Sequence, residues 1–130
     1  MVGKKKLEQR VIFLDQKYLG YQVIGVSDYY VQASQLESFG LTVVEAMLQK
    51  RPVIVSDLPA FKALTKNGSL GTLFKASSQK DLKDKIVEVL ENDKAIKKKT
   101  ALAYDYAKNR YTAEIMWQKT EALYKHFLEK

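Results

Sequence analysis

Two glutamates flank a glycine-containing stretch in the first half of the chain, and their spacing suggests a ligand site. Glu37 and Glu45 stand eight positions apart, with Gly40 between them. Gly40 lies where a predicted strand gives way to a predicted helix, and a glycine there lets a ligand approach the backbone closely. In open α/β sheets, ligands bind at this carboxyl edge of the strands. The stretch is therefore the segment best suited to chemistry.

The first turn of the predicted helix indicates an anion site. The N–H groups of Phe39, Gly40 and Leu41 stand at the helix start, where backbone donors have no partner within the helix. Together with the helix dipole, such donors favour a phosphate, or a sugar hydroxyl beside it.

The two carboxylates suit different parts of such a ligand. Glu45 lies about five residues into the helix, roughly 7–8 Å along its axis, where the ribose of a nucleoside diphosphate anchored at the helix start would fall. A carboxylate there can accept hydrogen bonds from the ribose hydroxyls. Glu37 precedes the helix, and a phosphate would repel it. Glu37 is better suited to the hydroxyls of a transferred sugar, where its charge would oppose positive charge developing at the anomeric carbon.

Spacing alone leaves a plainer alternative open. The helix dipole favours a glutamate near a helix start without any ligand, and Glu45 could be a solvated helix residue. The spacing therefore does not decide between a ligand site and an ordinary helix start.

The elements that must position these residues alternate between short apolar runs and helical stretches. Strands are predicted over residues 11–14, 29–33, 53–55 and 71–74. Helices are predicted over 18–26, 41–49 and 59–65, followed by a helix opened by Ser78, a Lys-rich helix to about Arg110 and a final helix capped by Thr112. This alternation indicates an α/β fold: a Rossmann-like parallel sheet of about four strands, with helices on both faces and a helical C-terminal third.

The composition excludes several kinds of chemistry. The chain has 130 residues, with Lys+Arg 22 against Asp+Glu 15 and a formal net charge of +7. The absence of cysteine excludes disulfides, thiolate metal sites and cysteine nucleophiles, and indicates a reducing, cytoplasmic setting. A single histidine, His126, argues against a histidine-ligated metal site or a Ser-His-Asp triad. No bilayer-spanning segment and no signal peptide are expected.

The positive charge is densest at residues 4–6 and 94–99. Aromatic residues do not alternate with these lysines as a base-stacking surface requires, so no nucleic-acid partner is expected and a nucleic-acid binder is the weakest hypothesis. A solvated helix face with a frayed N-terminus is the simplest interpretation. The functional alternative is attraction to an anionic membrane surface, at about 1 kcal/mol per well-placed Lys or Arg.

The segment ESFGLTVVEAM at 37–47, followed by RPVIVSD at 51–57, closely resembles the E-x7-E region of family 4 glycosyltransferases. These are retaining enzymes of the GT-B fold that use nucleotide sugars. The runs at 11–14, 28–31 and 71–74 and the final helix with Trp117 and Tyr124 follow in the family's order. The resemblance therefore covers nearly the whole chain.

The resemblance implies a role for each matching residue. Glu37 matches the glutamate that faces the donor sugar and the reaction centre, and is the expected catalytic residue; Glu45 matches the glutamate that holds the ribose. Donor binding is further implied for Ser34, Ser38, Phe39, Gly40 and Leu41. Asp15 is implied in a loop near the base, where the family has glycine. Lys50 replaces another family glycine, at a position that affects packing.

The implied protein is the donor-binding segment of a retaining glycosyltransferase. It would transfer a sugar from a nucleotide diphosphate sugar to a glycan or lipid-linked acceptor, in polysaccharide biosynthesis. No cofactor and no metal is required by the residues present. The family's second domain begins with two further strands and a basic pair that neutralises the leaving diphosphate, and neither is in this sequence; nor is the N-terminal acceptor domain. Residues 1–130 are therefore expected to form a single partial domain that is inactive alone.

The implied partners are the nucleotide-sugar donor and either the missing acceptor domain or another copy of the chain. In the family's strand order, 3-2-1-4-5-6, the missing strands would lie between those at 11–14 and 29–33. Without the acceptor domain, Met116, Trp117, Tyr124 and Phe127 would be exposed and would favour self-association.

Two further expectations accompany this interpretation. The alternative function is a non-catalytic binding or assembly module that kept the half-fold but lost transfer. The expected location is cytoplasmic, with peripheral attachment to the inner face of the membrane as the alternative that the positive charge suggests.

Overall fold

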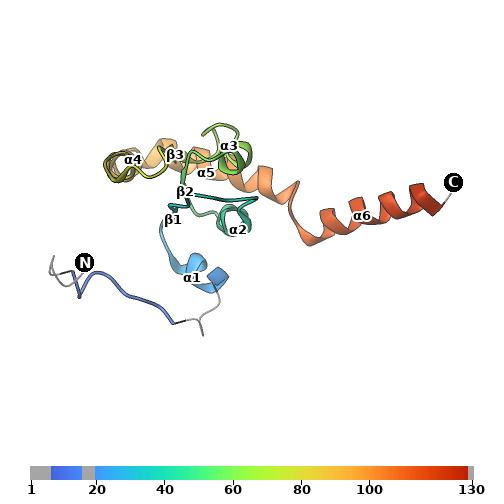
Figure 1. Ribbon diagram of the computed structural model, residues 1–130, viewed down its shortest axis with the longest axis horizontal. Coiled ribbons are helices and arrows are strands. Elements are labelled where there is room, and N and C mark those ends of the chain that lie inside the picture. The colour runs from blue at the N-terminus through green and yellow to red at the C-terminus, as the bar shows by residue number, and fades with distance from the viewer. Residues whose placement is uncertain (1–6, 16–19, 129–130) are drawn as a thin grey trace.

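Helices alternate with short strands through the first two-thirds of the fold, and three helices follow (Figure 1). The structure is a computed structural model that describes residues 7–15 and 20–128. The strands are β1 Tyr30–Gln32, β2 Val53–Ser56 and β3 Thr72–Phe74. The helices are α1 Gly20–Val26, α2 Leu41–Leu48, α3 Pro59–Leu64, α4 Gln79–Glu91, α5 Asp93–Lys108 and α6 Ala113–Leu128. The α/β class predicted from the alternation is confirmed.

The strands form a parallel sheet in the order β1-β2-β3. In register, Val31 of β1 pairs with Ile54 of β2, and Val55 of β2 pairs with Leu73 of β3. All four residues of β2 are buried, as the continuous apolar run predicts for a central strand covered on both faces. The carboxyl ends of the strands therefore meet at one edge, where the loop with Glu37 and Gly40 begins.

Helices cover both faces of this sheet, as predicted. Val53 and Val55 of β2 pack in one cluster with α2, α3 and the C-terminal half of α5. Ile54 points to the other face, where it packs with Phe74 of β3, Val89 of α4 and Ile96 of α5. The strand's alternation of side chains thus divides the core between two layers of helices.

The strand predicted at residues 11–14 is wrong. Its residues are exposed, with Ile12 at 80% and Phe13 at 83% relative accessibility, and they have no strand assignment. An apolar run forms a strand only where a neighbouring strand pairs with its backbone, and within the described ranges none lies beside this one. The sheet consequently has three strands there rather than about four.

Most of the other predicted elements are confirmed within a residue or two of their ends. The start of the helix predicted at 18–26 falls on residues outside the described ranges, and the helix is seen from Gly20. Ser78 caps α4 as predicted, because its hydroxyl accepts a hydrogen bond from the N–H of Asp81 at 3.2 Å. Thr112 does the same for Ile115 in α6, at 3.4 Å.

The last helix, α6, extends away from the rest of the fold (Figure 1). None of its residues is buried. Met116, Trp117, Tyr124 and Phe127 are each between 65% and 67% exposed. The predicted exposure of this apolar surface is therefore confirmed.

Candidate functional site

The turn into α2 requires a glycine at position 40. Gly40 is the N-cap of α2 with φ 93° and ψ 53°, a left-handed conformation that side chains rarely adopt. A Cβ added to Gly40 would lie 2.7 Å from Cε1 of Phe61 and 3.2 Å from Cδ1 of Leu64. The chain therefore enters α2 tightly against α3, and the backbone at the helix start stays bare.

Gly40 and Leu41 keep the free N–H groups that the sequence predicts. Neither N–H donates a hydrogen bond to any residue in 7–15 or 20–128. Leu41 is 69% exposed, so its end of the helix is open to solvent. These two donors at a helix N-terminus suit an anion.

Phe39 differs from the prediction. Its N–H donates to Oε1 of Glu37 at 3.3 Å, and the N–H of Ser38 donates to the same oxygen at 3.0 Å. The side chain of Glu37 thus folds back onto its own loop and occupies two donors. The expectation of a free N–H at Phe39 is wrong in this structure because the neighbouring carboxylate reaches it first.

The other carboxylate oxygen of Glu37 is held by the last residue of β1. Nε2 of Gln32 donates to Oε2 of Glu37 at 3.0 Å and to Oγ of Ser34 at 3.1 Å. Ser34 is tied to the sheet in turn, because its carbonyl accepts a hydrogen bond of 2.7 Å from the hydroxyl of Ser56 in β2. Ser34 and Glu37, both predicted site residues, are therefore joined through Gln32.

A cluster of hydroxyls completes this network. Oη of Tyr30 lies 2.7 Å from Oε1 of Gln32 and 2.8 Å from Oγ1 of Thr42, and the Thr42 hydroxyl donates to Oε1 of Gln32 at 2.9 Å. Burial raises the pKa of Tyr30 above its ordinary value, and the charges of Glu45 and Glu37 raise it further. Tyr30 is therefore a neutral hydroxyl at physiological pH.

Glu45 stands free on the exposed surface of α2. The charges of Glu45 and Glu37 both contribute to raising the pKa of the Tyr30 hydroxyl. The two glutamates differ in surroundings, because Glu37 is partly buried and hydrogen-bonded while Glu45 faces solvent.

Asp15 also approaches this region. It lines a cavity of about 470 Å³ together with Leu14, Ile24, Tyr30 and Thr42. This cavity lies along β1, the edge strand of the sheet. Asp15 itself is exposed, and it shares the lining of this cavity with Tyr30 and Thr42.

Sequence reasoning missed Tyr30, Gln32 and Thr42. Tyr30 and Gln32 are two positions apart on one strand, which puts them on the same face, directly before the glutamate motif. This pattern could have indicated them: polar residues stand at alternate positions at the end of a strand that is otherwise apolar. Thr42 carries no such signal, because its contact depends on how α2 packs on β1.

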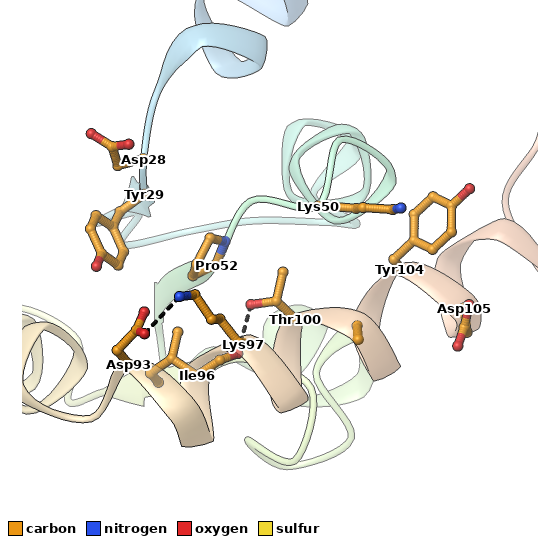
Figure 2. Close-up of a pocket in the computed structure, with 11 residues that line it drawn as sticks. Asp28, Tyr29, Lys50, Pro52, Asp93, Ile96, Lys97, Thr100, Tyr104 and Asp105 are labelled. Atoms are coloured by element: carbon orange, nitrogen blue, oxygen red, sulfur yellow. Dashed lines mark hydrogen bonds and ion pairs between the residues drawn. The ribbon is translucent and has the colours of Figure 1, made fainter.

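A larger cavity lies at the amino ends of the strands, where β1 and β2 begin (Figure 2). It measures about 520 Å³ and its walls include Pro52. Three of its charged groups have partners: Lys97 pairs with Asp93 at 2.7 Å, and Nζ of Lys50 lies 4.6 Å from the ring centre of Tyr104. The carboxylates of Asp28 and Asp105 also line it. Lys50, at φ 56°, adopts the left-handed conformation that glycine favours.

Two features are absent from residues 7–15 and 20–128. No three His, Cys, Asp or Glu side chains gather there in a way that could hold a metal ion. None of the helices within 20–128 is both long and apolar enough to cross a membrane.

The parallel sheet with helices on both faces defines a class, a Rossmann-like α/β domain. The chain belongs to the family described as glycosyl transferases group 1, whose family model matches residues 1–110. The GT-B resemblance proposed from the sequence is thereby confirmed at the level of the family.

Two known relatives are similar to parts of this chain. Phosphatidyl-myo-inositol mannosyltransferase of Mycobacterium leprae is 44% identical over 57 residues, which cover 44% of this chain and 15% of that protein. N-acetyl-alpha-D-glucosaminyl L-malate synthase of Bacillus anthracis is 23% identical over 124 residues, 95% of this chain and 32% of the relative.

Solved structures agree on the fold. Anabaena HepE in complex with UDP and glucose matches with a TM-score of 0.84 and 26% identity, over 95% of this chain and 34% of HepE. Its complex with UDP-glucose matches equally well, with a TM-score of 0.84. The chain spans about a third or less of the length of these relatives.

Proposed function

We propose that this chain carries donor-binding residues of a retaining glycosyltransferase that uses a nucleotide diphosphate sugar. The observation that carries the proposal is the start of α2, where the free N–H groups of Gly40 and Leu41 stand between Glu37 and Glu45 along the chain. An anion such as a diphosphate is stabilised by the donors, and hydroxyl groups on either side of it suit the two carboxylates.

Each residue has a distinct part in this proposal. Glu45 accepts hydrogen bonds from the ribose hydroxyls, one helical turn from the diphosphate. Glu37 faces the transferred sugar. As the catalytic residue, it stabilises the positive charge that develops at the anomeric carbon of that sugar. Leu41 and Gly40 bind the diphosphate through backbone N–H groups, with Ser38, Phe39 and Ser34 shaping the loop. Asp15 lies toward the base.

The nature of the donor is supported by similarity. HepE is described in complex with UDP, with UDP and glucose and with UDP-glucose, and the Mycobacterium leprae relative is named as a mannosyltransferase. A nucleotide sugar is accordingly the proposed ligand, with a glycan or lipid-linked acceptor bound by protein outside this chain. The proposal assigns the diphosphate to backbone donors at the start of α2 and invokes no metal.

A thermal-shift screen with UDP-glucose, GDP-mannose and ADP-glucose tests donor binding. The proposal predicts a rise in melting temperature with at least one of them and none with free glucose or mannose, because a ligand that binds only the folded state stabilises it. No shift with any of the three nucleotide sugars would contradict the proposal. The purified chain is predicted to transfer no sugar to an acceptor by itself, and a radiolabelled product would overturn that part.

The proposed setting is the cytoplasmic face of a membrane. Lys94 and Lys98 are exposed on α5, and a lysine near an anionic surface contributes about 1 kcal/mol of attraction. Cosedimentation with vesicles of phosphatidylglycerol should therefore exceed that with phosphatidylcholine vesicles. Equal sedimentation with both would remove the membrane from the proposal.

A further inference from the structure

We infer that Gln32 is a positioning residue that holds the carboxylate of Glu37 toward the donor sugar, with Tyr30 and Thr42 fixing the direction of its amide. The inference deepens the proposed function and rests on it, because it assumes that Glu37 faces the sugar. Gln32 is the last residue of β1, so its position is set by a hydrogen-bonded sheet rather than by a loop.

The amide of Gln32 has both of its donors and both of its acceptor positions occupied. Nε2 donates to Glu37 at 3.0 Å and to Ser34 at 3.1 Å. Oε1 faces the hydroxyls of Tyr30 at 2.7 Å and Thr42 at 2.9 Å. A side-chain amide offers two N–H donors and about two acceptor lone pairs. The amide therefore has no spare position in this network.

These contacts also decide which way round the amide lies. If the amide were turned over, Oε1 would face the carboxylate of Glu37 and Nε2 would face two hydroxyls. The carboxylate accepts hydrogen bonds only, while a hydroxyl can donate, so the observed direction is the one that satisfies every partner. Tyr30 and Thr42 consequently act on Glu37 through Gln32, without touching it.

The carboxylate of Glu37 therefore has a fixed direction and one free position for a hydrogen-bond donor. The N–H groups of Ser38 and Phe39 and the amide of Gln32 supply three donors to Glu37, while a carboxylate has about four lone-pair positions. One acceptor position therefore remains for a sugar hydroxyl. A carboxylate already ordered before the ligand arrives loses less conformational freedom on binding.

Calorimetric titrations with UDP and with UDP-glucose separate positioning from mere support of the fold. In Gln32→Leu, which removes the amide, the affinity for UDP-glucose should fall about tenfold, while the affinity for UDP should stay within about twofold, because UDP lacks the sugar. Gln35→Leu is the matched control, since Gln35 is an exposed glutamine of the loop that follows β1. Equal losses for both ligands, or no loss for either, would overturn the inference.

A reversal of polarity tests the contact without any ligand. Gln32→Glu would place two carboxylates face to face, so it should lower the melting temperature and shift the amide resonances of Ser38 and Phe39. In the double variant Gln32→Glu/Glu37→Gln, the new amide at position 37 can donate to the new carboxylate at position 32. This variant should recover most of the melting temperature and of the original resonance positions. Absence of recovery would overturn the inference. Should the unmodified chain bind neither UDP nor UDP-glucose, the proposed function fails, while this reversal still decides whether Gln32 holds Glu37.

Discussion

Glu37 and Glu45 differ in how much the protein constrains them. Glu37 accepts hydrogen bonds from its own loop and from β1, whereas Glu45 stands on the exposed face of α2. A constrained carboxylate suits a reaction centre, where geometry sets the rate. An exposed carboxylate suits a binding role, in which it gains its partners from the ligand.

Replacing Glu45 by alanine should weaken nucleotide binding. The loss of hydrogen bonds from the ribose hydroxyls, worth roughly 0.5–1.5 kcal/mol each, predicts about a tenfold lower affinity for UDP and UDP-glucose alike. Calorimetry measures both affinities, and Glu91→Ala, an exposed glutamate on α4, is the matched control. Identical affinities for the Glu45→Ala chain and the unmodified chain would remove Glu45 from the ribose role.

Tyr30 should ionise at higher pH than an ordinary tyrosine. Its burial and the nearby charges of Glu45 and Glu37 disfavour the phenolate, so its pKa lies above the usual value of about 10. The folded state then holds this proton more tightly than the unfolded state, and the free energy of unfolding should fall as pH rises past about 10. Tyr30→Phe should lack that contribution.

NMR of ring-labelled tyrosine measures this titration directly. A Tyr30 signal that ionises at or below the pH of a model tyrosine peptide would contradict the prediction. The charge contribution can be isolated in Glu45→Gln, where the Tyr30 pKa should move back toward its ordinary value.

At the residue scale, the sequence was most informative where backbone geometry dictates the residue. Gly40 could be predicted because a chain entering a helix beside a ligand needs a bare backbone, and the structure shows the left-handed φ that goes with it. The N–H of Phe39 could not be predicted, because the side chain of Glu37 competes for it. The partners of Gln32 depend on how α2 packs against β1, which spacing along the chain does not reveal.

At the scale of elements, the junction between β1 and α2 depends on close packing at Gly40. Phe61 and Leu64 of α3 lie where a Cβ on Gly40 would stand. The helix start is therefore positioned by α3 as well as by the sheet. Any side chain at position 40 would move α2, α3 or both.

Gly40→Ala should lower the free energy of unfolding by roughly 2–4 kcal/mol, because the left-handed backbone and overpacking are both costly. Gly20→Ala is the matched control: Gly20 is the first residue of α1, but nothing lies within 4 Å of its added Cβ. Its effect should lie between no change and about 1 kcal/mol of stabilisation. Urea denaturation measures both, and equal effects in the two variants would contradict this account of Gly40.

The elements that could be predicted are those whose partners lie within the described chain. The apolar run of β2 becomes a strand because β1 and β3 pair with it on both sides. The run at 11–14 is also apolar but is exposed. An apolar run favours burial because its surface is more stable out of water. Whether the run becomes a strand depends on whether a neighbouring strand forms hydrogen bonds with its backbone.

For the whole molecule, α6 presents an exposed apolar surface. Trp117, Tyr124 and Phe127 are all more than 60% exposed, and such surfaces mark interaction sites or lead to association. Their spacing along the helix predicts a packing surface, and the extended position of α6 (Figure 1) agrees with it.

The chain should therefore self-associate as its concentration rises. Sedimentation velocity should show larger species at high concentration, and Trp117→Glu/Phe127→Glu should shift them back toward the monomer. Gln118→Glu, a change of charge at an exposed α6 residue, is the control and should leave association in place. A monomer at every concentration would count against this role of α6.

The central claim, that the start of α2 binds a nucleotide sugar, is tested most directly by mapping a ligand onto the labelled chain by NMR. Titration with UDP-glucose, GDP-mannose or ADP-glucose should shift the amide signals of Ser38, Gly40, Leu41 and Glu45. Signals around the larger cavity at Lys97 should stay unchanged. Shifts confined to that larger cavity, or no shifts with any of the three nucleotide sugars, would contradict the account.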